Sequence, residues 1–308
     1  MTATALLGLW AQTSIHAGAG SSIDGIDLPI QREGHNGWPC VFGSAVKGAL
    51  RAKAEDLWGK NNDSVRYVFG PDSDSEKASE HAGALMVGDA RLLLLPVRSL
   101  TGYFKWVTCP SLLKRLQRDA ERLNIKLESF SIPKFKQEER EIGFQLHISN
   151  GKEKEDLFLE EYRISTTPQK ELSELVNVLH NLSGIENTDL ENQLVVVSDE
   201  MFTYLCKYAT PVVAHIAIDN EKKTVKSGAL WYEETLPPET VFYVALAANA
   251  VRDDKATFEN QAVKDSNAAA VLTSITETLF AKPKNYLQIG GNETVGMGWC
   301  KVQISKGA

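Results

Sequence analysis

Residues 5–18 read ALLGLWAQTSIHAG, an apolar run that ends at a glycine and is typical of a β-strand. A loop follows over about residues 18–42. The next segment, Ser44–Trp58, carries apolar side chains at helical spacing, and Gly83–Val97 again has the composition of one or two strands. The chain therefore begins with a strand, a helix and a strand.

The C-terminal part repeats this order. Val241–Ala248 is a short apolar run typical of a buried strand, and about Asn267–Phe280 is helical in pattern. Two strands, Tyr286–Ile289 and Trp299–Ile304, close the chain. The repeated order favours an α+β, ferredoxin-like arrangement over a parallel doubly wound sheet. We expect strands near 4–14, 84–97, 241–248 and 299–304 in one antiparallel sheet, with helices 44–58 and 267–280 on one face.

Between these ends, the pattern predicts further helices and a hairpin. Pro110 suits the first turn of a helix, Thr167-Pro168 is expected to open a second, and Ser198–Tyr208 a third. Val212–Ile218 and Val225–Trp231 flank a polar tip and predict a β-hairpin. Because no linker divides the chain, we expect a single domain over residues 1–308 with insertions at about 125–165 and 208–232.

Composition excludes several classes of protein. The chain has 308 residues, of which 33 are basic and 40 acidic, for a net charge of −7, which argues mildly against a general nucleic-acid coat protein. No apolar run approaches the roughly 20 residues of a membrane helix, so no membrane partner is expected. The four cysteines form no C-x-x-C motif, and a reducing cytoplasm is the simplest compartment.

The loop from His16 to Glu33 combines titratable and polar residues. Asp24 and Asp27 are able to bind a divalent metal, His16 to move a proton and Arg32 to hold a phosphate. The competing interpretation is a solvated turn in which the two aspartates cap backbone amides, and for an isolated Asp-x-x-Asp this interpretation is the stronger one.

A glycine-rich loop and a pair of helical cations suggest anion binding. The loop 290–298, GGNETVGMG, matches neither the dinucleotide fingerprint nor a P-loop. Its glycines nevertheless let the backbone approach a ligand closely. The alternative interpretation is a strained connection between two strands, without a ligand. Lys47 and Arg51 are four residues apart near a helix N-terminus, which suits a phosphate, although solvated surface cations are the commoner case.

Two other stretches leave the choice open. Residues 98–122 interleave basic side chains with aromatic ones, a pattern that fits a single nucleic-acid strand or an ordinary amphipathic helix with core aromatics. Glu233 and Glu234 precede a Pro-Pro turn, and their solvated interpretation is favoured.

Four ordered segments together resemble a known family: SIHAGAGSSIDGIDLPIQREGHNGWPCVFGSAVKGALR (14–51), GDARLLLLPVRSLTGYFKWVTCP (88–110), SGALWYEETLPPETVF (227–242) and IGGNETVGMGW (289–299). They are similar to the backbone subunit of type III-B CRISPR Cmr complexes, the fourth Cmr protein, within the RAMP superfamily. The resemblance implies a modified ferredoxin-like, RRM-related fold with a β-hairpin thumb. It also implies a cytoplasmic, antiviral assembly in which copies of the subunit stack as a filament along a CRISPR guide RNA, together with other Cmr subunits.

The resemblance further implies endoribonuclease activity. A loop carboxylate would promote cleavage of single-stranded target RNA at regular intervals with Mg²⁺ or Mn²⁺. Asp27 matches the catalytic aspartate and metal ligand, with Asp24 in reserve, and His16 matches the loop histidine. Lys47 matches the guide-contacting lysine. The expected RNA-binding set comprises Lys47, Arg51, Ser44, Arg98, Lys105, Gly290, Gly291, Gly296 and Gly298.

Two other functions remain open at this stage. In the first, the chain is a non-catalytic RNA-binding scaffold of the same complex. In the second, it is a stand-alone nucleotide-binding enzyme, which would need a closed pocket and a fuller set of catalytic residues.

Overall fold

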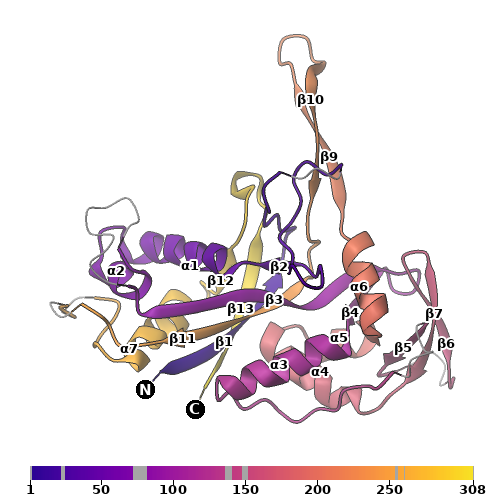
Figure 1. The fold of residues 1–308 in the computed structure, drawn as a ribbon, viewed down its shortest axis with the longest axis horizontal. Coiled ribbons are helices and arrows are strands. Elements are labelled where there is room, and N and C mark those ends of the chain that lie inside the picture. The colour runs from indigo at the N-terminus through magenta and orange to yellow at the C-terminus, as the bar shows by residue number, and fades with distance from the viewer. Residues whose placement is uncertain are drawn as a thin grey trace.

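Four antiparallel strands form the centre of the protein. The computed structural model describes residues 2–21, 25–71, 82–135, 141–147, 152–253, 256–259 and 261–307. The central strands lie in the order β13-β1-β11-β3, with all three neighbouring pairs antiparallel (Figure 1). Their bounds are β1 (Ala3–Ala11), β3 (Leu85–Arg98), β11 (Val241–Ala248) and β13 (Trp299–Lys306). The antiparallel sheet expected from the sequence is confirmed.

The two helices expected on one face of this sheet lie there. Leu7 and Leu9 of β1 share a buried core cluster with α1 (Gly43–Trp58) and α7 (Ala268–Thr273). Leu6, the residue before Leu7 in β1, belongs to the core cluster on the opposite face, because side chains alternate along a strand. Helix α1 starts at Gly43, whose N–H donates to Asp89 Oδ1 at 2.7 Å, so Ser44 lies inside the helix. Helix α7 continues as a π-helical segment, η2 (Ser274–Leu279).

Beyond β3 the sheet becomes mixed. It continues in the order β4-β8-β5-β7-β6, with β4–β8 and β5–β7 parallel and the other pairs antiparallel. Helices α3 and α4 pack against the face that carries Leu6, Leu93 and Leu94. The remaining bounds of this part are β4 (Phe104–Thr108), α3 (Pro110–Arg122), β5 (Ile142–Gln145), β6 (Glu155–Leu159), β7 (Tyr162–Pro168), α4 (Leu172–Ser183), α5 (Asn187–Gln193), β8 (Leu194–Val197) and α6 (Asp199–Tyr208).

One predicted helix start is wrong. Thr167 and Pro168 end strand β7, where Pro168 pairs with Gln145 of β5, and helix α4 begins only at Leu172. Helix α4 itself is amphipathic, and its apolar residues Leu172, Leu175, Val176, Leu179 and Leu182 are all buried. The strand end accepts a proline because the following residue, Gln169, supplies the N–H that Gln145 receives.

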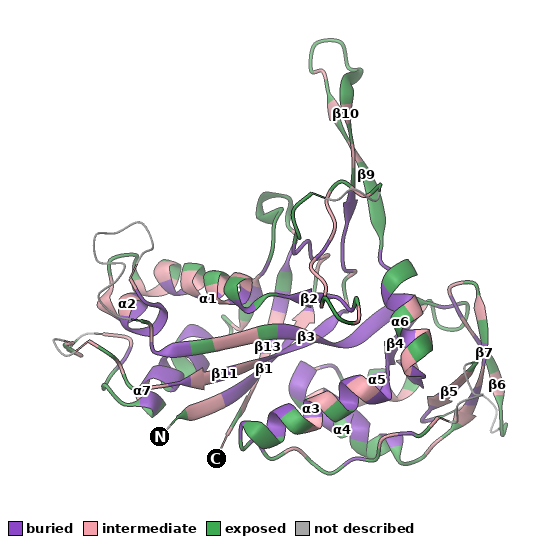
Figure 2. Ribbon diagram, viewed as in Figure 1, coloured by how far each residue is buried: buried purple, intermediate pink, exposed green. Residues whose placement is uncertain are grey.

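The predicted hairpin is present and extends from the body. Strands β9 (Val212–Ile218) and β10 (Val225–Glu234) pair antiparallel as a separate two-stranded ribbon. Figure 1 shows this ribbon standing away from the sheet, and Figure 2 shows that it is largely exposed except at its foot. The other elements are β2 (Cys40–Val41), α2 (Asp63–Phe69), β12 (Tyr286–Gln288) and the 3₁₀ segment η3 (Glu293–Val295).

Candidate functional site

Asp27 lies where the β1–β2 loop passes the foot of the hairpin. The backbone of Leu28 bonds to β10 on both sides: its N–H donates to Tyr232 O at 3.1 Å, and its carbonyl accepts from Glu234 N at 3.0 Å. The Asp27 side chain is exposed, and its Oδ2 accepts from Tyr232 N at 2.7 Å. The tertiary fold thus brings a solvent-facing carboxylate to the point where the hairpin leaves the body.

His16 lies beside the same foot but is buried. Its Nδ1 is 2.8 Å from the carbonyl oxygen of Glu234 and 3.5 Å from Glu233 Oε1. A carbonyl only accepts, so Nδ1 carries the proton and Nε2 is the ring atom left to accept. A side chain at Gly18 would place its Cβ 3.0 Å from Nε2, so the glycine leaves room at this atom.

The glycine-rich loop packs against the segment after β1 that carries His16. Gly291 N donates to His16 O and Gly298 N to Ser14 O, both at 2.8 Å. Gly290 has φ +87°, and a Cβ there would lie 2.4 Å from His16 O, so only glycine fits. Gly296 N also donates within the loop, to Glu293 O at 2.9 Å. The N–H groups of Gly291, Gly296 and Gly298 therefore already donate within the protein, and contact between this loop and RNA stays a prediction.

Glu233 and Glu234 are buried, which corrects the solvated interpretation. Each residue is 3% exposed. Glu233 Oε1 accepts from the Asn292 side chain, and its Oε2 lies 3.9 Å from His215 Nε2. Glu234 instead forms an ion pair with Arg32, whose Nη2 donates to Glu234 Oε1. The two neighbouring carboxylates thus have different partners: Glu233 contacts Asn292 of the glycine-rich loop and lies near His16, whereas Glu234 pairs with Arg32.

The cations predicted for RNA binding lie in different environments. Lys47 is half-buried, and burial lowers its pKa, with Arg51 and Arg252 adding to the effect. Arg51 Nε donates to Glu55 Oε1 at 2.8 Å, while Ser44 is exposed. These three residues lie on helix α1, so the structure brings them together as the sequence predicts.

Two other predicted contacts are already engaged in the protein. Lys105 is 6% exposed, its Nζ donates to Asn192 O at 2.7 Å, and burial lowers its pKa. Its ammonium group therefore already has a structural contact. Arg98 is exposed but pairs with Glu160 at 2.8 Å. On the helix after Pro110, Arg115 is likewise held inside, against Glu33 and over the ring of Trp38.

A metal ion would find few protein ligands here. Asp24 lies outside the described residues, and within the described part of the chain no group of three or more His, Cys, Asp or Glu residues is arranged to hold a metal. The exposed Asp27 carboxylate nevertheless fits Mg²⁺, which keeps several waters and takes one or two carboxylates together with substrate phosphates.

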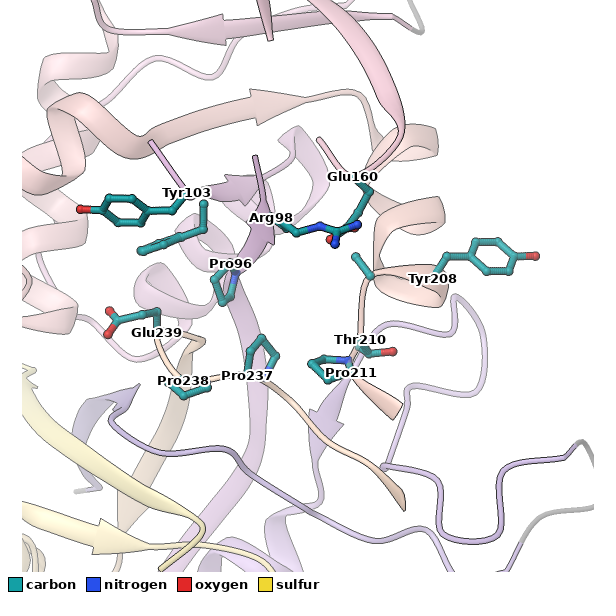
Figure 3. Close-up of a pocket in the computed structure, with 12 residues that line it drawn as sticks. Pro96, Arg98, Tyr103, Glu160, Tyr208, Thr210, Pro211, Pro237, Pro238 and Glu239 are labelled. Atoms are coloured by element: carbon teal, nitrogen blue, oxygen red, sulfur yellow. The ribbon is translucent and has the colours of Figure 1, made fainter. Parts of the chain in front are cut away.

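A cavity of about 480 Å³ lies beside α6 and the turn after the hairpin. Pro96, Pro211 and Pro237 form its walls, whereas Tyr103 and Tyr208 point outward at its rim (Figure 3). Its acids are engaged: Glu160 pairs with Arg98, and Glu239 Oε2 accepts from Trp10 Nε1 at 2.9 Å. Burial raises the pKa of Glu239. Neither His16 nor Asp27 lines this cavity.

Comparison with known families agrees with this geometry. The model of the RAMP superfamily matches residues 11–301. The chain belongs to the RAMP superfamily. Among the described residues of this RAMP protein, no helix is long and apolar enough to cross a membrane.

Relatives of this RAMP protein include characterised Cmr proteins. It is 34% identical over 304 residues to the CRISPR system Cmr endoribonuclease Cmr4 of Pyrococcus furiosus, covering 98% of this chain and 95% of that one. The crystal structure of oligomeric Cmr4 from Pyrococcus furiosus superposes with a TM-score of 0.70 at 26% identity, covering 99% and 98% of the two chains. The cryo-EM structure of the Type III-B Cmr-beta bound to cognate target RNA matches at a TM-score of 0.67 over 99% and 97%; at 21% identity it shows the fold alone.

Proposed function

We propose that this RAMP protein is the backbone subunit of a type III-B CRISPR effector complex and cleaves RNA complementary to the guide. The observation that carries the proposal is the exposed Asp27 carboxylate at the foot of the projecting hairpin. The relative at 34% identity bears the name of a Cmr endoribonuclease, and its sequence is matched over almost the whole chain.

The strand order supports the finer description of the fold. In sequence order the central elements are strand β1, helix α1, strands β3 and β11, helix α7 and strand β13, and the spatial order β13-β1-β11-β3 is that of a ferredoxin-like unit. We propose a single domain of this type over residues 1–308, with insertions near 125–165 and 208–232. The second insertion contains hairpin β9–β10, to which we assign the role of the thumb.

RNA cleavage at this site can use the target's own 2′-hydroxyl. The attacking oxygen, the phosphorus and the leaving oxygen must lie in line, and an A-form duplex prevents that alignment. A hairpin that opens the guide–target duplex and displaces a base provides the alignment through geometry, which is among the larger effects available to an enzyme. In this proposal, the Asp27 carboxylate at the hairpin foot acts on the displaced nucleotide, and its exposure supports that role.

The residues around Asp27 have distinct roles in this proposal. Asp27 holds a divalent ion, which when bound stabilises charge that develops on the phosphate. His16 presents only Nε2 to a ligand, because Nδ1 donates to Glu234 O, and so orients the RNA. Lys47, Arg51 and Ser44 on α1 bind guide phosphates, and the basic side chains position the RNA without reading its sequence.

A binding-only scaffold is the second candidate, and one observation favours it. Asp27 Oδ2 accepts a backbone hydrogen bond from Tyr232 N, as an aspartate with a purely structural role would. In that case the chain would hold guide RNA in a filament with other copies and other Cmr subunits, while another subunit cuts.

Purification tests the RNA-guided role, and the Asp27→Ala variant separates the two candidates. The expressed chain should copurify with a short, defined RNA and form a ladder of oligomers, as expected for either RNA-guided role. Target cutting by the assembled complex that disappears in Asp27→Ala, with guide binding and assembly retained, identifies the ribonuclease. Full-rate cutting by the Asp27→Ala assembly would refute the assignment, and loss of assembly would mark Asp27 as structural.

A further inference from the structure

The carboxylate of Glu234 ties the loop that carries Asp27 to the foot of the hairpin. Its Oε1 accepts from Arg32 Nη2 and, at 2.7 Å, from Thr210 Oγ1. Its Oε2 accepts from the backbone N–H of Ile30 at 3.1 Å. Both oxygens of a carboxylate that is 4% exposed are therefore used, and three segments of the chain meet on it.

Arg32 also links the β1–β2 loop to helix α6. Its Nη1 donates to Gly37 O at 2.8 Å and to Cys206 O at 2.9 Å. Cys206 lies in the last turn of α6, where carbonyls lack intrahelical donors and the helix dipole favours a cation. Figure 1 shows the β1–β2 loop beside the hairpin foot, with α6 leading into it.

These contacts fix the stretch directly after Asp27. Ile30 is three residues from Asp27, and between them Leu28 is bonded on both sides to β10. The Asp27 carboxylate itself bonds to Tyr232 N. The position of Asp27 relative to the hairpin thus depends on where Glu234 and Arg32 hold the loop.

Stability alone does not explain this ion pair. Apolar residues of similar volume replace buried ion pairs in other proteins with little loss of stability, and often with a gain. An apolar pair, however, cannot receive the N–H of Ile30 or the hydroxyl of Thr210. What the charged pair provides is a defined geometry.

We propose that Arg32 and Glu234 are positioning residues for target cleavage, which set the Asp27 carboxylate against the nucleotide displaced by the hairpin. The inference rests on the proposed function, because it requires Asp27 to act on RNA. A displacement of about 1 Å in a reacting group can cost about 100-fold in rate. Disruption of the pair should therefore slow cutting without weakening the binding of guide or target.

Glu234→Gln tests the pair directly. The amide keeps the shape of the carboxylate but replaces one acceptor oxygen with a donor, which opposes either Ile30 N–H or Arg32. In assembled complexes with saturating target, we expect the single-turnover cutting rate to fall by about 10- to 100-fold. Guide affinity, target affinity and the oligomer ladder should stay at the wild-type level.

A double variant separates positioning from folding. Arg32→Met with Glu234→Met removes both charges, so no unpaired charge stays buried. This protein should assemble and still cut slowly. Thr210→Val should cause a smaller loss of rate, and Thr210→Ser, which keeps the hydroxyl, should restore it. Glu239→Gln is the matched control: this glutamate is five residues away and bonds to Trp10 instead of the loop, so cutting should be unchanged.

Several outcomes would overturn the positioning role of Arg32 and Glu234. Wild-type cutting by the double variant overturns the inference, as does a loss of rate that is fully explained by weaker guide or target binding. Failure of both the Glu234→Gln and the double variant to assemble also overturns it, because the pair is then structural. Asp27→Ala, measured in parallel, keeps the two proposals apart. If it cuts at full rate, the proposed function fails; if it is inactive while the pair variants cut normally, only the positioning role fails.

Discussion

The foot and the tip of hairpin β9–β10 differ in burial and in their hydrogen bonds to the body, although they belong to one ribbon. At the foot, residues Glu233–Leu236 are buried and bonded to the β1–β2 loop, whereas residues Glu221–Gly228 at the tip are exposed (Figure 2). An isolated two-stranded ribbon is marginally stable in water. The body therefore fixes the foot, whereas the order of the tip depends on its own turn and on the molecules it contacts.

The apolar residues of the ribbon sharpen this difference. Strands β9 and β10 expose several large apolar side chains, namely Val212, Val213, Ile216, Ile218, Val225 and Leu230. Exposed apolar patches of this kind mark interaction surfaces. Under the proposed function, the foot carries the chemistry, and the exposed apolar side chains along the ribbon make contacts outside the chain.

The largest expected effect comes from the foot. Asp27→Ala should abolish target cutting by the assembled complex, because the exposed carboxylate at the displaced nucleotide is removed. Asp219→Ala is the control at the tip, where Asp219 Oδ1 accepts from Glu221 N and Lys222 N. Single-turnover assays of both variants with equal guide loading measure the contrast. A tip variant as inactive as the foot variant would break the division between them.

Removal of divalent metal should have the same effect as Asp27→Ala. Chelation should stop cutting while guide binding and the oligomer ladder remain, and added Mg²⁺ or Mn²⁺ should restore the rate. The reason is that the sparse ligand set at Asp27 needs an ion to counter phosphate charge. Wild-type cutting in excess chelator would mean that geometry and the 2′-hydroxyl suffice without metal.

Two leucines test the stability side of the comparison. Leu236, fully buried at the foot, should cost about 2–5 kcal/mol of unfolding free energy when changed to alanine, from lost burial and the cavity left behind. Leu230, 55% exposed on the ribbon, should cost no more than about 0.5 kcal/mol. Denaturant unfolding of the RNA-free protein measures both. Equal losses would show that the ribbon packs against the body in solution.

The smallest expected effect concerns the proposed guide-binding residue Lys47 on helix α1, away from both parts of the hairpin. Lys47→Ala should weaken guide binding for all sequences and reduce the salt slope by about 1, because phosphate contacts position without specifying. Salt titrations of guide affinity measure the slope. An unchanged affinity and slope would move the RNA groove elsewhere.

The pH dependence of guide affinity follows from the lowered pKa of Lys47. Burial, with Arg51 and Arg252 nearby, lowers that pKa below the ordinary value of 10.5. Lys47 therefore loses its proton, and its phosphate contact, at a lower pH than a free lysine does. Guide affinity should fall as pH rises toward that pKa, and Lys47→Arg, which stays charged, should flatten the profile. A wild-type profile as flat as that of Lys47→Arg would contradict the assignment.

Local sequence determined the elements whose pattern is periodic and self-contained. Helix Gly43–Trp58, strand Val241–Ala248 and the hairpin were predictable because apolar spacing and turn residues lie within one short stretch. The motifs around His16, Asp27 and the glycine-rich loop also sufficed to indicate the family. The helix expected at Thr167-Pro168 failed because pairing with β5, a distant strand, extends β7 to that proline.

Only the tertiary structure decided which polar groups are free to act. Glu234 looks solvated in sequence, yet it meets Arg32 across 202 positions of chain, and no local pattern reports such a contact. Lys105 looks like a surface cation but lies inside, and the N–H groups of Gly291 and Gly298 donate to backbone carbonyls of the segment that carries His16. Spacing records which side chains share one element. Burial and hydrogen bonding between elements depend on how the whole chain packs, and that packing leaves Asp27 exposed while it encloses Glu234.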